Sequence, residues 1–217
     1  MSNKPTVKVP AGDNIYLRGV NMDVTFSESN HIVLKLINRY DNNNHFSIGG
    51  DVRALFNYKD VNSVIKIPDY AFYSSYKNDK TLTNCSWYMD DIREIGKYSF
   101  YEAFYNTLLT NPLNFSNVTS VGEGGFGWTY FGCTSLTTGP DFSNLTTVGN
   151  YSFSRCFSGC SKLTQITAPN IPSWDTSIFN NWLNNVASSG VVRKPDTLTI
   201  PTGSTSGVPT DWTTEDY

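Results

Sequence analysis

The sequence predicts an α+β repeat solenoid: a short stack of about four coils, closed by a β-rich N-terminal cap and a helix-plus-strand C-terminal cap. Three observations predict it. A pattern of aliphatic, glycine and aromatic residues returns about every 27 residues, each copy has two aromatic residues at fixed positions, and only 16% of the 217 residues are charged. Repeats of this kind bury their apolar sides only by stacking on one another.

The repeat is most obvious in the stretch FSNVTSVG, which begins at Phe115 and returns as FSNLTTVG at Phe142. Extending the comparison outward gives four copies of one pattern: IPDYAF from Ile67, IGKYSF from Ile95, VGEGGF from Val121 and VGNYSF from Val148. We place the copies near residues 64–91, 92–117, 118–144 and 145–170, which makes residues 61–170 the solenoid.

The core of this solenoid is predicted by three columns of residues. The phenylalanine that closes each motif and the aromatic residue four positions later form two of them: Phe72, Phe100, Phe126 and Phe153, then Tyr76, Phe104, Tyr130 and Phe157. Because residues four apart share a face of a helical turn, we expect each coil to send both rings inward from a short helix or 3₁₀ segment. A third column follows: Leu82, Leu109, Leu136 and Leu163.

A threonine directly follows each of these leucines: Thr83, Thr110, Thr137 and Thr164. Alternation in an extended segment turns the leucine inward and the threonine outward. Two interpretations stay open for this threonine column and for the aromatic residues expected to flank it. It is either a face that binds a glycan or protein by stacking and hydroxyl hydrogen bonds, or a solvated strip of good β-formers. The flanking candidates are Trp128 first, then Trp87, Tyr88, Trp174 and Trp212.

The two ends of the chain lack the repeat and are expected to cap the stack. Residues 1–60 alternate apolar and polar positions in short runs, which predicts strands, and VRALFN from Val52 is expected to close this module against the first coil. In residues 171–217, Ile178, Trp182 and Val186 have helical spacing, with Asp175 or Thr176 as N-cap and Gly190 as terminator. Short extended pieces follow.

Composition excludes several classes of protein. The net charge is −3 and no basic stripe occurs, so no nucleic-acid partner is expected. No apolar run approaches the roughly 20 residues of a membrane span, and the opening MSNKPTVKVPAGDN lacks the apolar core of an export signal. The four cysteines lack the spacing of a zinc site, so we expect buried free thiols and neither metal nor cofactor.

The chain also offers little for catalysis. His31 and His45 are the two histidines, and neither lies in a recognisable triad pattern. No pair of carboxylates recurs in an arrangement that would suit glycoside hydrolysis. We therefore expect a protein that is not an enzyme.

The repeats resemble the BspA-like leucine-rich repeat, whose units join an Ile-Gly and an Ala-Phe step to a Gly-Cys-Thr/Ser-x-Leu-Thr segment. That segment stands here as GCTSLT at Gly132 and GCSKLT at Gly159. The first two copies depart from it, because Ser75–Leu82 has no Gly-Cys and Asn106-Thr107 replaces it in the second copy. The opening AGDNIYLRG with GDVRALFN, and the tail from FNNWLNNVASSGVV onward, resemble terminal modules of a subgroup found in gut bacteria and their phages.

This resemblance implies a noncatalytic structural or binding component of a bacteriophage virion, in a tail fibre, head fibre or baseplate. Its partners would be other virion proteins or copies of itself, and a glycan or protein of the host surface. The expected location is then the virion. The alternative is a leucine-rich-repeat adhesion module on a bacterial cell surface.

Overall fold

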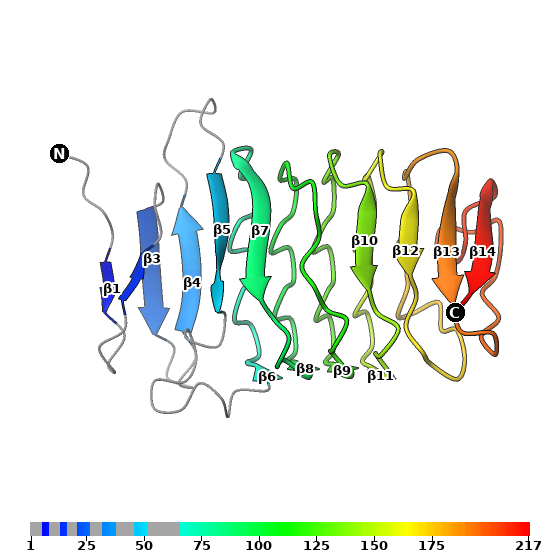
Figure 1. Ribbon diagram of the computed structural model, residues 1–217, viewed down its shortest axis with the longest axis horizontal. Coiled ribbons are helices and arrows are strands. Elements are labelled where there is room, and N and C mark those ends of the chain that lie inside the picture. Colours follow the sequence, from blue (N-terminus) through cyan, green and yellow to red (C-terminus); the bar gives the residue numbers. More distant parts are fainter. Residues whose placement is uncertain (1–5, 9–13, 17–20, 27–31, 38–45, 52–65) are drawn as a thin grey trace.

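The computed structural model describes residues 6–8, 14–16, 21–26, 32–37, 46–51 and 66–217. These residues form a solenoid of about six turns, built of strands and turns with no helix among them (Figure 1). The strands are β1 (Thr6–Lys8), β2 (Asn14–Tyr16), β3 (Asn21–Phe26), β4 (Ile32–Ile37), β5 (Phe46–Asp51), β6 (Lys66–Ile67), β7 (Leu82–Tyr88), β8 (Glu94–Ile95), β9 (Ser120–Val121), β10 (Thr138–Asp141), β11 (Thr147–Val148), β12 (Gln165–Thr167), β13 (Gly190–Lys194) and β14 (Trp212–Asp216).

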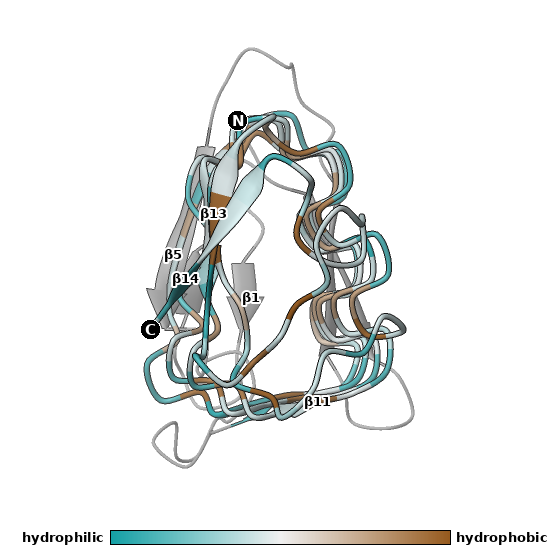
Figure 2. Cartoon of the chain, turned by 90° about the vertical axis from the view of Figure 1, so that its right-hand side faces the viewer, coloured by the Kyte–Doolittle hydropathy of each residue, from teal (hydrophilic) through white to brown (hydrophobic). Residues whose placement is uncertain are grey.

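Each coil has three sides, which Figure 2 shows in a view along the stack. One side contains the parallel sheet β10-β12-β13-β14 together with β7, which pairs in parallel with β5. A second side contains the short parallel sheet β6-β8-β9-β11. The third side is made of consecutive turns, which we call the turn ribbon. It consists of residues 69–78, 97–106, 123–132, 150–159 and 176–185. Two antiparallel pairs, β1-β2 and β3-β4, complete the strands.

The long sheet is interrupted in the second coil, where Thr110 to Leu113 form no strand between β7 and β10. This coil carries Pro112 at the position where the next coil carries Gly139. Proline has no backbone N–H, so it cannot donate a hydrogen bond to a neighbouring strand. The second coil therefore forms no strand here, although the N–H of Thr110 still donates to the carbonyl of Thr83 at 3.1 Å.

The turn ribbon has an alternating pattern of backbone hydrogen bonds. Phe100 and Glu102 donate their N–H groups to the next coil, to Gly125 and Gly127 at 2.9 and 3.0 Å, whereas Tyr101 between them donates three residues back, to Tyr98. Every fourth residue has a left-handed backbone, with φ of 51° at Tyr98, 54° at Glu102 and 58° at Asn106. The result is a run of tight turns whose carbonyl and N–H groups bond neighbouring coils.

This pattern corrects the expected helices. An α-helix over residues 175–190 is absent, and so is the short helix or 3₁₀ segment expected in each coil. Asn181 and Asn185 have left-handed backbones, with φ of 51° and 54°, and the carbonyls of Asn180 and Asn184 accept from the fourth coil. Because the ribbon also repeats every fourth residue, it places Ile178, Trp182 and Val186 at the same spacing that a helix would require.

The two aromatic columns form stacked spines through the core, as predicted. Phe126 lies between Phe100 and Phe153, with ring centroids 6.1 and 5.6 Å away. In the second spine Tyr130 stacks on Phe104 and on Phe157, at 5.6 Å each and within 18° of parallel. All eight rings of these columns are buried, and so are the four leucines of the third column. Adjacent coils therefore cover each other's aromatic rings.

The stack is longer than the four coils that the repeat predicted. Residues 171–217, expected to cap it with a helix, instead add two further turns whose strands β13 and β14 extend the long sheet. Phe179 stacks on Phe153 at 5.2 Å, and Trp182 meets the ring of Phe157 edge-on at 6.4 Å. Trp182 also donates from Nε1 to the carbonyl of Gly207, 2.8 Å away in the last turn. The α+β class is therefore wrong for the described residues.

Of the remaining predictions, the one for the cysteines is confirmed, and those for the Val52 stretch and the histidines concern residues that the structure does not describe. All four cysteines are free and buried, as expected, and burial raises the pKa of each thiol, to about 11 at Cys133. The stretch from Val52 and both histidines, His31 and His45, lie outside the described residues. The module boundaries at residues 60 and 170 stay predictions. Among the described residues, none forms a helix long and apolar enough to cross a membrane.

Candidate binding faces

The threonine column lies on the side of the solenoid that contains β7, β10, β12, β13 and β14, which we call the strand face. Thr83 lies in β7 and is half-buried, whereas Thr110, Thr137 and Thr164 are exposed. The hydroxyl of Thr110 donates to the carbonyl of Thr83 at 3.2 Å, and that of Thr164 donates to the carbonyl of Thr137 at 3.2 Å. Adjacent coils therefore fix the side chains of Thr110 and Thr164, whose hydroxyl oxygens can accept; that of Thr110 already accepts from the amide of Asn111 at 3.3 Å.

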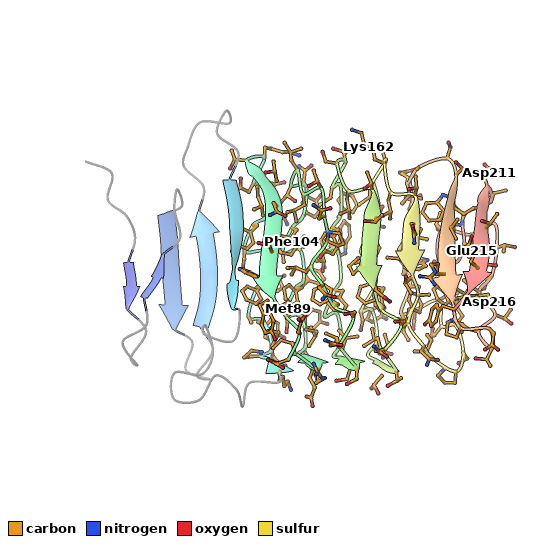
Figure 3. All side chains as sticks on the ribbon, in the orientation of Figure 1. Met89, Phe104, Lys162, Asp211, Glu215 and Asp216 are labelled. Carbon is orange, nitrogen blue, oxygen red and sulfur yellow. The ribbon has the colours of Figure 1, made fainter. Side chains whose placement is uncertain are left out.

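A second exposed column lies directly beside it and consists of Asn111, Thr138 and Gln165. Across three successive coils the strand face thus offers paired uncharged groups: hydroxyl oxygens in one column, and amide or hydroxyl groups in the next. Charges appear at its C-terminal end, where Lys194 in β13 pairs with Asp216 in β14 at 2.5 Å. Figure 3 labels Asp216, with Glu215, on this last strand.

Trp128 lies elsewhere, in the turn ribbon of the third coil. Its backbone is left-handed, with φ of 56°, and its ring contacts Phe131 at 4.8 Å and Tyr105 at 6.1 Å between centroids. The guanidinium of Arg155 lies 4.8 Å from the centroid of the indole. The structure therefore does not bring Trp128 together with the threonine column.

The other aromatic candidates differ in exposure. Trp87 and Trp212 are buried, and Trp87 packs on Phe72 with centroids 4.6 Å apart. Trp174 stacks on Phe179 in the fifth turn. Tyr88, at the end of β7, is 44% exposed and is the candidate that most clearly borders the strand face.

Sequence reasoning missed a cluster of four tyrosines on the turn ribbon: Tyr70, Tyr73, Tyr98 and Tyr101. Tyr70 stacks on Tyr98 at 5.5 Å and Tyr73 on Tyr101 at 5.3 Å, with ring planes within 15°. The two stacks touch, since the rings of Tyr98 and Tyr101 are 5.7 Å apart. We call this cluster the tyrosine quartet. Its signal in the sequence is a repeated spacing of three, DYAFY in one copy and KYSFY in the next.

The quartet is fixed at its edge by a carboxylate. The phenol of Tyr98 donates to Oε1 of Glu123 at 2.8 Å, and this hydrogen bond, with a smaller contribution from burial, raises the pKa of Tyr98 to about 12. Glycines make room for the rings: a Cβ at Gly124 would lie 2.3 Å from Cε1 of Tyr98. Among the residues from 66 onward, no group of three or more His, Cys, Asp or Glu side chains is placed to hold a metal ion.

Comparison with known proteins supports the repeat. The family model described as the BspA type leucine rich repeat region matches residues 154–191. A crystal structure of a leucine-rich repeat protein from Bacteroides ovatus ATCC 8483 is 17% identical, with a TM-score of 0.31. The match covers 85% of this chain and 60% of that chain. No curated protein matches the chain. The family match over residues 154–191 supports the leucine-rich repeat and the solenoid predicted from the sequence.

Proposed function

We propose that this chain is a noncatalytic binding module whose strand face holds a protein or a glycan. The observation that carries the proposal is the repetition of exposed, uncharged groups at Thr110, Thr137 and Thr164 and in the column beside them. Because the hydroxyl hydrogens at Thr110 and Thr164 are already donated within the solenoid, this column offers acceptors. The amide of Gln165 offers donors as well, and that of Asn111 has one N–H left beside the hydrogen bond it donates to Thr110. A rigid stack presents them at a fixed spacing.

The absence of catalysis is part of this proposal. The four cysteine thiols are buried, and because burial raises the pKa of each, they are protonated near neutral pH and are poor nucleophiles. Polar strand residues with flanking aromatic groups suit reversible contacts with a partner surface.

For the biological setting we propose a bacteriophage virion, as part of a fibre or baseplate that contacts the host. The support is the resemblance of the opening and closing segments to the subgroup found in gut bacteria and their phages. The alternative is an adhesion module on a bacterial surface. Identification of the protein by mass spectrometry in purified phage particles would support the first setting, whereas its detection only in bacterial envelope fractions would support the second.

The strand face is tested by adding charge to it. The double variant Thr137→Glu/Thr164→Glu is expected to weaken binding to a responsive glycan or envelope fraction by roughly tenfold or more. The reason is that each glutamate side chain is longer than threonine and must lose its hydration when a partner covers the face, and it holds the partner away from the short threonine side chains. Binding is measured on a glycan array and on a panel of bacterial envelope fractions.

The matched control is Thr119→Glu/Thr146→Glu. Both residues are exposed, both hydroxyls donate to a carbonyl of the preceding coil, and both lie beside the short sheet of the second side. This control should bind as the unmodified chain does. Equal loss in the two double variants, or unchanged binding by Thr137→Glu/Thr164→Glu, would show that the strand face is only a solvated strip.

A further inference from the structure

One aromatic cluster on the turn ribbon, formed by Tyr105, Trp128 and Phe131, is covered by two cations of this chain. Tyr105 stacks on Phe131 at 4.8 Å, and Nζ of Lys77 lies 4.9 Å from the centroid of Tyr105. Lys77 also pairs with Glu102 at 2.7 Å. Arg155 of the fourth coil covers Trp128 of the third coil in the same way. A cation over an aromatic face is attracted by the ring quadrupole, so two rings of this cluster, Tyr105 and Trp128, already have a cation of the chain on one face.

The tyrosine quartet differs from this cluster in the charges that surround it. Carboxylates lie at its edge, because Glu123 accepts from Tyr98 and Asp69, the residue before Tyr70, accepts from the backbone N–H of Lys97. Among the residues that the structure describes, no cation lies over any of its four rings. Tyr70 and Tyr73 are 46% and 39% exposed. The quartet therefore has the aromatic and acidic parts of a cation site but not the cation.

The orientation of the rings also restricts what can bind. The inner faces of Tyr98 and Tyr101 are covered by Tyr70 and Tyr73, so the accessible parts are ring edges, phenol oxygens and the outer faces of Tyr70 and Tyr73. The outer faces of Tyr70 and Tyr73 are open to a sugar or to a planar cation, and the neighbouring carboxylate of Asp69 favours the cation. A planar guanidinium can stack on an outer face, and Asp69, the residue before Tyr70, is the carboxylate of the same coil. Tyrosines already held in place lose little conformational entropy on binding.

We propose that the tyrosine quartet docks an arginine-bearing segment of a partner polypeptide. The guanidinium takes the place over Tyr70 and Tyr73 that Lys77 takes over Tyr105 and Arg155 takes over Trp128. The quartet lies on the turn ribbon rather than on the strand face, so this site is independent of the binding proposed above.

The test uses a short Gly-Ser-Arg repeat peptide and a second peptide in which every arginine is glutamine. Titration is followed by calorimetry and by the ring-proton resonances of the tyrosines. The arginine peptide should shift the resonances of Tyr70 and Tyr73, and Tyr70→Ala/Tyr73→Ala should weaken its binding about tenfold. The glutamine peptide should not bind.

Tyr151→Ala is the matched control, because Tyr151 is a 54% exposed tyrosine of the same ribbon outside the quartet. It should bind the arginine peptide normally, and so should Thr137→Glu/Thr164→Glu, which separates this site from the strand face. The resonance shifts in the unmodified chain keep the test informative even where the double variant folds poorly.

Three results would overturn the proposal. Binding of the arginine peptide that is unchanged in Tyr70→Ala/Tyr73→Ala would mean attraction by net charge alone. Equal binding of the glutamine peptide would remove the role of the guanidinium. Self-association that the double variant abolishes, without peptide binding, would make the quartet a contact between two copies of this chain.

Discussion

Replacing Phe126 with alanine is expected to lower the free energy of unfolding by about 3–5 kcal/mol. Phe126 is fully buried at the centre of the first spine, and its ring contacts those of Phe100 and Phe153 in the adjacent coils. It also packs on Phe115 at 4.7 Å and on Phe142 at 5.4 Å. The alanine therefore leaves a cavity between three coils. Urea unfolding followed by circular dichroism measures the loss.

Tyr151→Ala is the control for this experiment. This variant also removes an aromatic ring, from the fourth coil, but Tyr151 is largely exposed. The free energy of unfolding should therefore change by no more than about 0.5 kcal/mol. A loss below about 1 kcal/mol for Phe126→Ala, or similar losses for both variants, would contradict a spine that is continuous across coils.

Replacing Gly149 with alanine is the second large effect, an expected loss of about 2–3 kcal/mol. An added Cβ would lie 2.5 Å from the backbone nitrogen of Glu123 and 2.7 Å from the carbonyl carbon of Gly122, both in the preceding coil. Backbone atoms cannot rotate away as a side chain can, so the two coils must separate locally. Gly96 and Gly122 hold the same position in earlier coils.

Gly132→Ala separates crowding from backbone conformation. Gly132 has a φ of 68°, but its nearest neighbour for a Cβ, Oδ1 of Asn106, is 3.4 Å away. Gly132→Ala should lower the free energy of unfolding by about 1 kcal/mol, the cost of placing an alanine in a left-handed backbone conformation. Thermal and urea unfolding of both variants give the comparison. A larger loss for Gly132→Ala than for Gly149→Ala would show that the coils do not approach as closely as the structure indicates.

The core could be predicted from the sequence because burial imposes a strict column on a stacked repeat. Phe100 and Phe126 meet equivalent neighbours in successive coils, and all four copies of the repeat carry phenylalanine at this position. The leucine of each coil is restricted in the same way, and Leu136 is fully buried. The pattern in one coil is weak by itself, but it can be recognised because it returns in four successive copies.

The turn ribbon could not be predicted, because its period of four resembles that of a helix. Ile178, Trp182 and Val186 fit both, and only the left-handed backbone at Asn181 and Asn185 distinguishes them. Asparagine tolerates this conformation, but Tyr98 and Glu102 adopt it as well, so composition gives no reliable signal. For the same reason, the sequence did not indicate that residues 171–217 form two further turns of the stack.

The tyrosine quartet was missed for a different reason. Tyr73 and Tyr101 recur in two copies only and are replaced by Gly127 in the third, so they do not form a column through the whole repeat. Their arrangement depends on that replacement, since a Cβ at Gly127 would lie 2.8 Å from Cδ2 of Tyr101. An exposed site of this kind depends on differences between copies, whereas repeat analysis detects what copies share.

Nuclear Overhauser measurements on the aromatic ring protons test the stacked solenoid most directly. We expect contacts from Phe126 to both Phe100 and Phe153, and from Tyr130 to both Phe104 and Phe157, because these rings lie 5.6–6.1 Å apart between centroids. Ring contacts confined to residues of a single coil, with no transfer from Phe126 to either neighbour, would contradict the account.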